Sequence, residues 1–133
     1  MITEDYVSFE TAKLLKEKGF NIPCHATYDT AVTGGKPRFS QYEVLNYFPR
    51  GMKNTDNKFD MVISAPTHQM AMKWLREVHN INIDIVSVWN QKRFEYQVFV
   101  VTPENAKHCY IDEKLYLVYE QACEEAIKYC LEI

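Results

Sequence analysis

Residues 81–100 read INIDIVSVWNQKRFEYQVFV, and this stretch decides the fold class. Large apolar side chains recur at every second position in both of its halves: Ile81, Ile83 and Ile85, then Phe94, Tyr96, Val98 and Val100. A period of two is typical of a β-strand with one buried face. The polar residues 90–93 between the halves suit a turn. The stretch therefore predicts an antiparallel hairpin.

Three helices are expected around this hairpin, over about 8–18, from Pro66 to about 79–80, and over about 114–131. The first has an N-cap serine, Ser8, and a glycine after its last turn, Gly19. The other two are predicted from apolar rows with a spacing of four residues: Met70, Trp74 and Val78, then Val118, Ala122, Ala126 and Cys130.

Further strands are expected over 22–29, 38–47 and 60–64, with a turn at 33–36 and an exposed polar loop at 52–58. Together these elements predict one α+β domain, residues 1–133. Its sheet is expected to be mostly antiparallel, with four to five strands and the helices on one face. Residues 13–17 and 73–77 are similar, which suggests an α-β-β unit used twice and then a C-terminal helix.

The bulk properties limit the classes of function. The formal net charge of −3 argues against nonspecific nucleic-acid binding as a default, because such proteins usually carry a basic excess. We find neither a signal peptide nor an apolar run of membrane-spanning length, so we expect a cytoplasmic protein that does not enter a membrane. The four cysteines are expected to be free thiols, most of them buried.

Three blocks of the sequence resemble a known group of proteins. They are residues 8–20, then 65–67 with 72–79, and finally 119–122 with 126–128. The blocks are similar to small uncharacterised proteins of gut Bacteroidales and of their phages and prophages. Because that group has no established activity, the resemblance implies a phage-related origin and supplies no catalytic residue.

Five residues are the best candidates for a binding site: His25, Tyr28, Arg76, His79 and Trp89. Each has a structural alternative. His25 follows Cys24 on a predicted strand, so the two side chains should point to opposite faces and cannot form a nucleophile–base pair. Trp89 or Tyr28 could line an aromatic surface for a partner, or pack in the core.

No metal or cofactor site is predicted. The histidines and cysteines lack the spacing of a metal site, and the sequence has no phosphate-binding or dinucleotide-binding glycine motif. The absence of a catalytic constellation favours a non-enzymatic binding module that acts on an unidentified protein partner. A sheet with one solvent-exposed face is also compatible with a homodimer.

A small nucleic-acid-binding or nucleotide-binding factor is the alternative, though it is not favoured. It rests on the lysines of the first helix and on Lys92-Arg93 in the turn.

Overall fold

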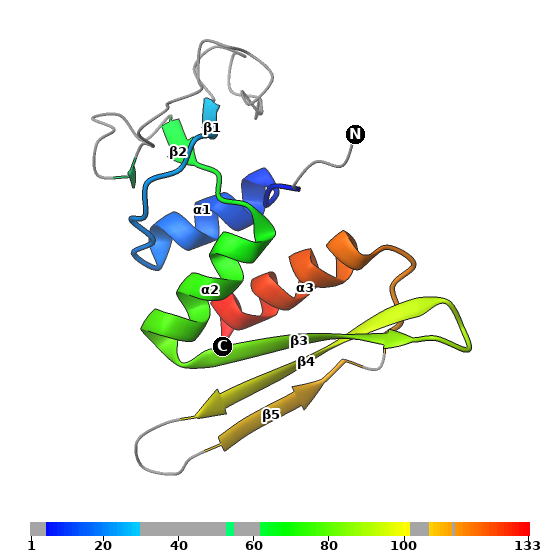
Figure 1. The fold of residues 1–133 in the computed structure, drawn as a ribbon. Helices are drawn as coiled ribbons and strands as arrows, with labels where there is room; N and C mark the ends of the chain where they lie inside the picture. The colour runs from blue at the N-terminus through cyan, green and yellow to red at the C-terminus, as the bar shows by residue number, and fades with distance from the viewer. Residues whose placement is uncertain (1–4, 30–52, 55–61, 102–106, 113) are drawn as a thin grey trace. The chain divides into compact units, whose positions relative to one another are not determined.

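The computed structural model describes residues 5–29, 53–54, 62–101, 107–112 and 114–133 (Figure 1). The chain divides into two compact units. The N-terminal unit is Tyr6–Thr67, and the C-terminal unit is His68–Ile133 together with Met1–Asp5. The expectation of a single domain over 1–133 stays a prediction.

The N-terminal unit begins with helix α1, Phe9–Glu17. Its N-cap is Ser8, whose Oγ accepts a hydrogen bond from the Thr11 N–H at 3.3 Å, and Gly19 follows the helix with a left-handed φ of 92°. Both capping features were predicted, because they depend on local sequence alone.

Two short strands complete this unit, β1 at Thr27–Asp29 and β2 at Val62–Ser64. They pair antiparallel, with Thr27 opposite Ser64. β1 is shorter than the predicted strand at 22–29, and residues 60–61 of the other predicted strand lie outside the described residues. The predicted turn at 33–36 and strand at 38–47 lie outside the described residues.

The loop expected at 52–58 is described only at Lys53 and Asn54, and there the expectation of exposure is wrong for one residue. Asn54 is buried. Its Nδ2 donates to the Phe20 carbonyl at 2.8 Å, and its Oδ1 accepts from the Ser64 N–H at 2.9 Å. A buried amide is stable when its hydrogen bonds are made, so this side chain ties β2 to the segment after α1.

The C-terminal unit contains α2 at His68–His79, β3 at Ile81–Val88, β4 at Arg93–Val101, β5 at Lys107–Ile111 and α3 at Tyr119–Glu132. The strands form an antiparallel sheet in the order β3-β4-β5. β3 and β4 pair without interruption from Ile81–Val100 to Val88–Arg93, which confirms the predicted hairpin. Strand β5 was not predicted.

Helices α2 and α3 lie on the same face of this sheet (Figure 1). That face presents the buried Tyr96 and Val98 of β4 to α3. The buried side of α3 consists of Ala122, Cys123, Ala126, Ile127, Cys130 and Leu131.

The apolar side of α2 differs from the predicted row. Trp74 is buried as expected, together with Ala71 and Leu75, but Met70 and Val78 are exposed. The buried side of the helix therefore consists mainly of Ala71, Trp74 and Leu75, and the predicted row contributes only Trp74 to it.

The described strands form two sheets, of two and three strands, so the single sheet of four to five strands is not confirmed. The α+β class with antiparallel pairing is confirmed. The α-β-β duplication stays a prediction. Across the described ranges, no helix has the length and apolar character needed to cross a bilayer.

Candidate binding surface

The five predicted site residues are divided between the two units. His25 and Tyr28 belong to the N-terminal unit, whereas Arg76, His79 and Trp89 belong to the C-terminal unit. Each group is therefore considered within its own unit, and their role in binding stays a prediction.

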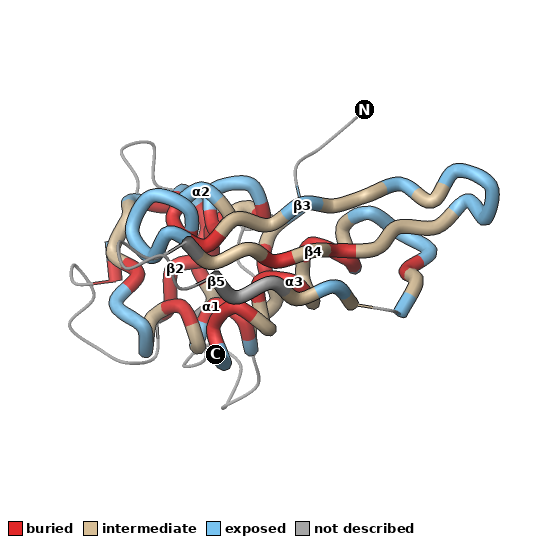
Figure 2. Tube along the Cα trace, turned by 90° about the horizontal axis from the view of Figure 1, so that it is seen from below, coloured by how far each residue is buried: buried red, intermediate tan, exposed pale blue. Residues whose placement is uncertain are grey.

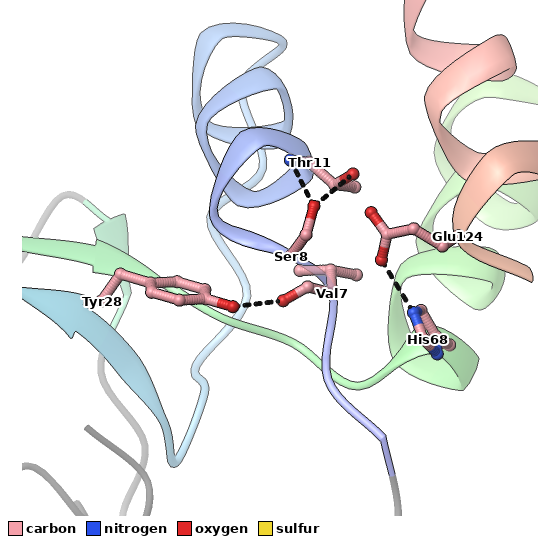
Figure 3. Close-up of polar contacts among 6 residues, drawn as sticks. All are labelled: Val7, Ser8, Thr11, Tyr28, His68 and Glu124. Carbon is pink, nitrogen blue, oxygen red and sulfur yellow. Dashed lines mark hydrogen bonds and ion pairs between the residues drawn. The ribbon is translucent and has the colours of Figure 1, made fainter. Parts of the chain in front are cut away.

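In the N-terminal unit, His25 is exposed and the neighbouring Cys24 is buried, and both precede β1 instead of lying on the predicted strand. Tyr28 has a structural contact. Its hydroxyl donates to the Val7 carbonyl at 2.9 Å, and its ring meets Phe9 edge-on at 5.5 Å (Figure 3). Tyr28 thus anchors β1 to the segment that enters α1.

Arg76 and His79 occupy exposed positions near the end of α2. The His79 ring lies edge-on against the buried Trp74, with centroids 4.6 Å apart. His79 is followed by Asn80 and then by the eight residues of β3, whereas Trp89 comes after that strand. At about 3.3 Å per residue, β3 separates His79 from Trp89 by more than 20 Å. These residues therefore do not form one pocket.

Trp89 lies in the turn between β3 and β4 and is 86% exposed. Figure 2 colours this turn as exposed, and in both Figures 1 and 2 the turn extends beyond the end of α3. Two hydrogen bonds within the turn order it, one between backbone groups and one from the Arg93 side chain. Gln91 N–H donates to the Val88 carbonyl at 3.1 Å, and Arg93 Nη1 donates to the Lys92 carbonyl at 3.1 Å. Trp89 is thus presented on an ordered hairpin.

A second group of exposed apolar residues lies at the same end of the unit. Leu117 is 61% exposed, Val118 48% and Tyr119 36%. Tyr116, the residue before them, pairs with Phe94 of β4 through two backbone hydrogen bonds of 2.7 and 2.8 Å. The Phe94 ring also meets Tyr119 edge-on at 5.8 Å. We call the residues Trp89, Leu117, Val118 and Tyr119 the hairpin-end surface.

Three cations border this surface. Lys92 and Lys114 are exposed, and Arg93 is half-buried. Lys114 Nζ lies 5.3 Å from the centre of the Tyr116 ring. None of the three is paired with a carboxylate of the described residues. These three cations therefore give this border of the surface a positive charge that no described carboxylate pairs with.

The sequence did not reveal most of this surface. Residues 117–119 were expected inside the third helix, whose apolar row included Val118. The helix instead begins at Tyr119 because Tyr116 is held beside Phe94, which leaves Leu117 and Val118 in the connection. The strong β-forming residues of 116–118 were the only available signal.

Four tyrosines pack between the sheet and α3. Tyr110 stacks on Tyr129 at 4.1 Å, and Tyr96 stacks on Tyr116 at 6.1 Å. The Tyr116 hydroxyl donates to Asp112 Oδ2 at 2.6 Å. Burial raises the pKa of Tyr96 and of Tyr116 above the ordinary value, and the negative charge of Asp112 raises both further. These phenols stay protonated near neutral pH, so the group supports packing rather than base catalysis.

A part-buried polar contact joins the two helices of the C-terminal unit. His68 Nε2, at the first residue of α2, lies 2.9 Å from Glu124 Oε1 of α3 (Figure 3). Among the described residues, no three histidine, cysteine or acidic side chains are grouped so that they could hold a metal ion. His68 therefore has a structural role in this arrangement.

The described cysteines are free and buried, as predicted: Cys24, Cys123 and Cys130. Burial raises the pKa of Cys24 and Cys130 to about 12 and that of Cys123 to about 11. A thiol of such pKa is almost entirely protonated at neutral pH, and the protonated form is a poor nucleophile. None of the three is suited to nucleophilic catalysis.

Comparison with known proteins gives no further identification. No protein-family model, curated protein sequence or solved structure matches this chain.

Proposed function

We propose that this chain is a non-enzymatic binding module that acts through protein–protein contacts and docks its partner on the hairpin-end surface. The observation that carries the proposal is the 86% exposure of Trp89 at the hairpin turn. Tryptophan is among the residues most enriched at interface hot spots, because its large ring loses much water-exposed area on binding.

The neighbouring residues support a contact larger than one side chain. Leu117, Val118 and Tyr119 are exposed at the same end of the unit, and exposed apolar residues grouped in one region often mark an interaction site. One backbone hydrogen bond and one from the Arg93 side chain order the turn that carries Trp89 before binding. Ordering the surface on binding would then cost little conformational entropy.

The charges indicate what the partner presents. Lys92, Arg93 and Lys114 border the apolar residues, and no carboxylate of the described ranges pairs with them. The fitting partner is a protein with an apolar pocket for the indole and with acidic side chains at its rim. Given the resemblance to phage and prophage proteins, we place the module in the cytoplasm as an accessory factor that contacts a host or phage protein.

The test compares the wild-type protein with Trp89→Ala as bait in lysate of the host cell, with Lys73→Ala as the matched surface control. We expect a protein that is retained by wild type and by the control and lost by Trp89→Ala. With that partner purified, calorimetry should show about a 30-fold or greater loss of affinity for Trp89→Ala, as for an interface hot spot. Equal retention by all three baits would contradict the proposal.

A nucleic-acid-binding role is the second candidate. The indole of Trp89 beside Lys92 and Arg93 combines a stacking platform with phosphate-binding cations, which is how single strands are bound without sequence preference. In a Trp74→Phe variant, Trp89 is the sole tryptophan and reports on such binding. Quenching by single-stranded oligonucleotides that weakens with salt would favour this role, and a flat titration at low salt would remove it.

A further inference from the structure

Strand β3 is an edge strand of the C-terminal unit, since the order of the sheet is β3-β4-β5. All eight of its residues pair with β4 in one continuous register without a bulge. On the other side of β3, the backbone N–H and C=O groups have no partner among the described residues. An edge of this kind is ready to pair with another strand.

This edge lacks the features that usually prevent pairing. Proteins protect edge strands with lysine, proline, bulges or short length. β3 has no lysine, proline or bulge, and Asp84 is its sole charged residue. The opposite edge strand, β5, is different because it has five residues and begins with Lys107.

Apolar side chains on both faces of β3 are incompletely covered. Ile83 and Ile85 point toward the helix side of the sheet with Ile81, yet only Ile81 is buried. On the other face, Val86 and Val88 are half-buried. A neighbouring strand that pairs over residues 81–85 would add cover for Ile83 and Ile85, which is how an edge strand completes a sheet.

We propose that β3 pairs antiparallel with β3 of a second copy of the chain, around a two-fold axis at Ile83. In this register Ile83 faces its own equivalent, Ile81 faces Ile85 of the second copy, and Asn82 faces Asp84 of the second copy. Within residues 81–85, each apolar side chain then faces an apolar one, and each Asn82 amide faces an Asp84 carboxylate. The two three-stranded sheets become one six-stranded sheet with closed C2 symmetry.

The single charge on the strand selects this register. An axis at Asp84 would place two carboxylates directly opposite each other, which is destabilising. An axis at Ile85 would place Asp84 against Val86 and leave the carboxylate without a polar neighbour. The axis at Ile83 is the arrangement that matches every facing pair from residue 81 to residue 85.

Sedimentation velocity of the full chain tests the assembly, and a charge exchange tests the register. We expect a dimer at micromolar concentration. Asn82→Asp creates two like-charge contacts and should weaken dimerisation by about 5- to 10-fold, whereas Asn82→Asp combined with Asp84→Asn should restore it. A monomer at all concentrations would overturn the proposal, and so would a dimer insensitive to Asn82→Asp.

Oxidative cross-linking locates the axis directly. In a Cys109→Ser background, Ile83→Cys should form a disulfide-linked dimer, since residue 83 faces its equivalent across the axis. Ser87→Cys should not, because residue 87 is then far from its equivalent. Cross-linking through Ile85→Cys instead of Ile83→Cys would overturn the register. This interface excludes the hairpin-end surface, so the outcome is independent of the proposed function.

Discussion

Different interactions stabilise the interior of each of the two units. Of the buried polar residues in the described chain, Thr11, Thr27, Asn54 and Ser64 lie in the N-terminal unit, and only His68 lies in the C-terminal unit. The N-terminal unit joins segments that are remote in sequence through single side chains. The C-terminal unit instead relies on an uninterrupted β-ladder and on tyrosine rings packed against α3.

This difference predicts different responses to substitution. A buried polar side chain that serves two backbone groups leaves both of them unsatisfied when it is removed, which is costly. Packing spread over many apolar contacts loses only a part when one hydroxyl group is removed. The N-terminal unit should therefore be the more sensitive of the two to the loss of a single polar group.

The largest effect is expected for Asn54→Ala. This substitution removes both buried hydrogen bonds, to the Phe20 carbonyl and from the Ser64 N–H, and it should lower the free energy of unfolding by about 3 kcal/mol. Urea unfolding followed by circular dichroism measures the change, with the exposed Lys13→Ala as the control. A loss below about 1 kcal/mol would mean that water or another group replaces the amide.

The next effect is expected at Tyr116 in the C-terminal unit. Tyr116→Phe removes the 2.6 Å hydrogen bond to Asp112 and keeps the ring, so we expect a loss of about 2 kcal/mol, as for a bond to a charged group. Tyr119→Phe is the matched control, because its hydroxyl accepts an exposed bond from Gln69 at 3.2 Å. Equal losses in the two variants would show that burial does not strengthen the Asp112 contact.

The elements governed by local sequence were predictable. Helix α1 followed from Ser8 and Gly19, and the β3–β4 hairpin followed from its alternating residues. The burial of Asn54 was not predictable, since a polar residue in a loop gives no periodic signal and its partners are at least ten residues away.

Strand β5 and the start of α3 were missed for a related reason. Both depend on pairing with β4, as in the bridge between Phe94 and Tyr116, and such long-range pairing overrides local preference. Of the candidate binding residues, Trp89 was left open between an aromatic surface and the core, and it is exposed. Its neighbours Leu117 and Val118 were assigned to a helix, so the surface that they form was not predicted.

A smaller effect on stability is expected at alkaline pH, and it should act on the C-terminal unit. Four tyrosines of this unit have a raised pKa: Tyr96, Tyr116, Tyr119 and Tyr129. The folded state binds these protons more tightly than the unfolded state. Their stabilising contribution is therefore complete below the unfolded pKa of about 10 and is lost as pH rises above it.

Absorbance at 295 nm measures this ionisation. In guanidinium chloride all nine tyrosines should titrate near pH 10, whereas in buffer some should remain protonated until the protein unfolds. Hydrogen exchange resolved by residue then shows which unit opens first. Earlier opening of the N-terminal unit at pH 10–11 would contradict the assignment of the sensitive groups to the C-terminal unit.

The smallest effect concerns the buried thiols, which lie in both units. At pH 8 a thiol with a pKa of about 12 is ionised in roughly one molecule in ten thousand, so Cys24 and Cys130 should resist alkylation in the native protein, and Cys123 nearly as much. Lys92→Cys, in the exposed hairpin turn, provides the reactive control. After alkylation, mass spectrometry of the digested protein identifies each modified cysteine.

Reaction at Cys24 alone would show that the N-terminal unit opens locally while the C-terminal unit stays closed, as expected if a few polar contacts hold the first and distributed packing holds the second. Reaction first at Cys123 or Cys130 would reverse that comparison.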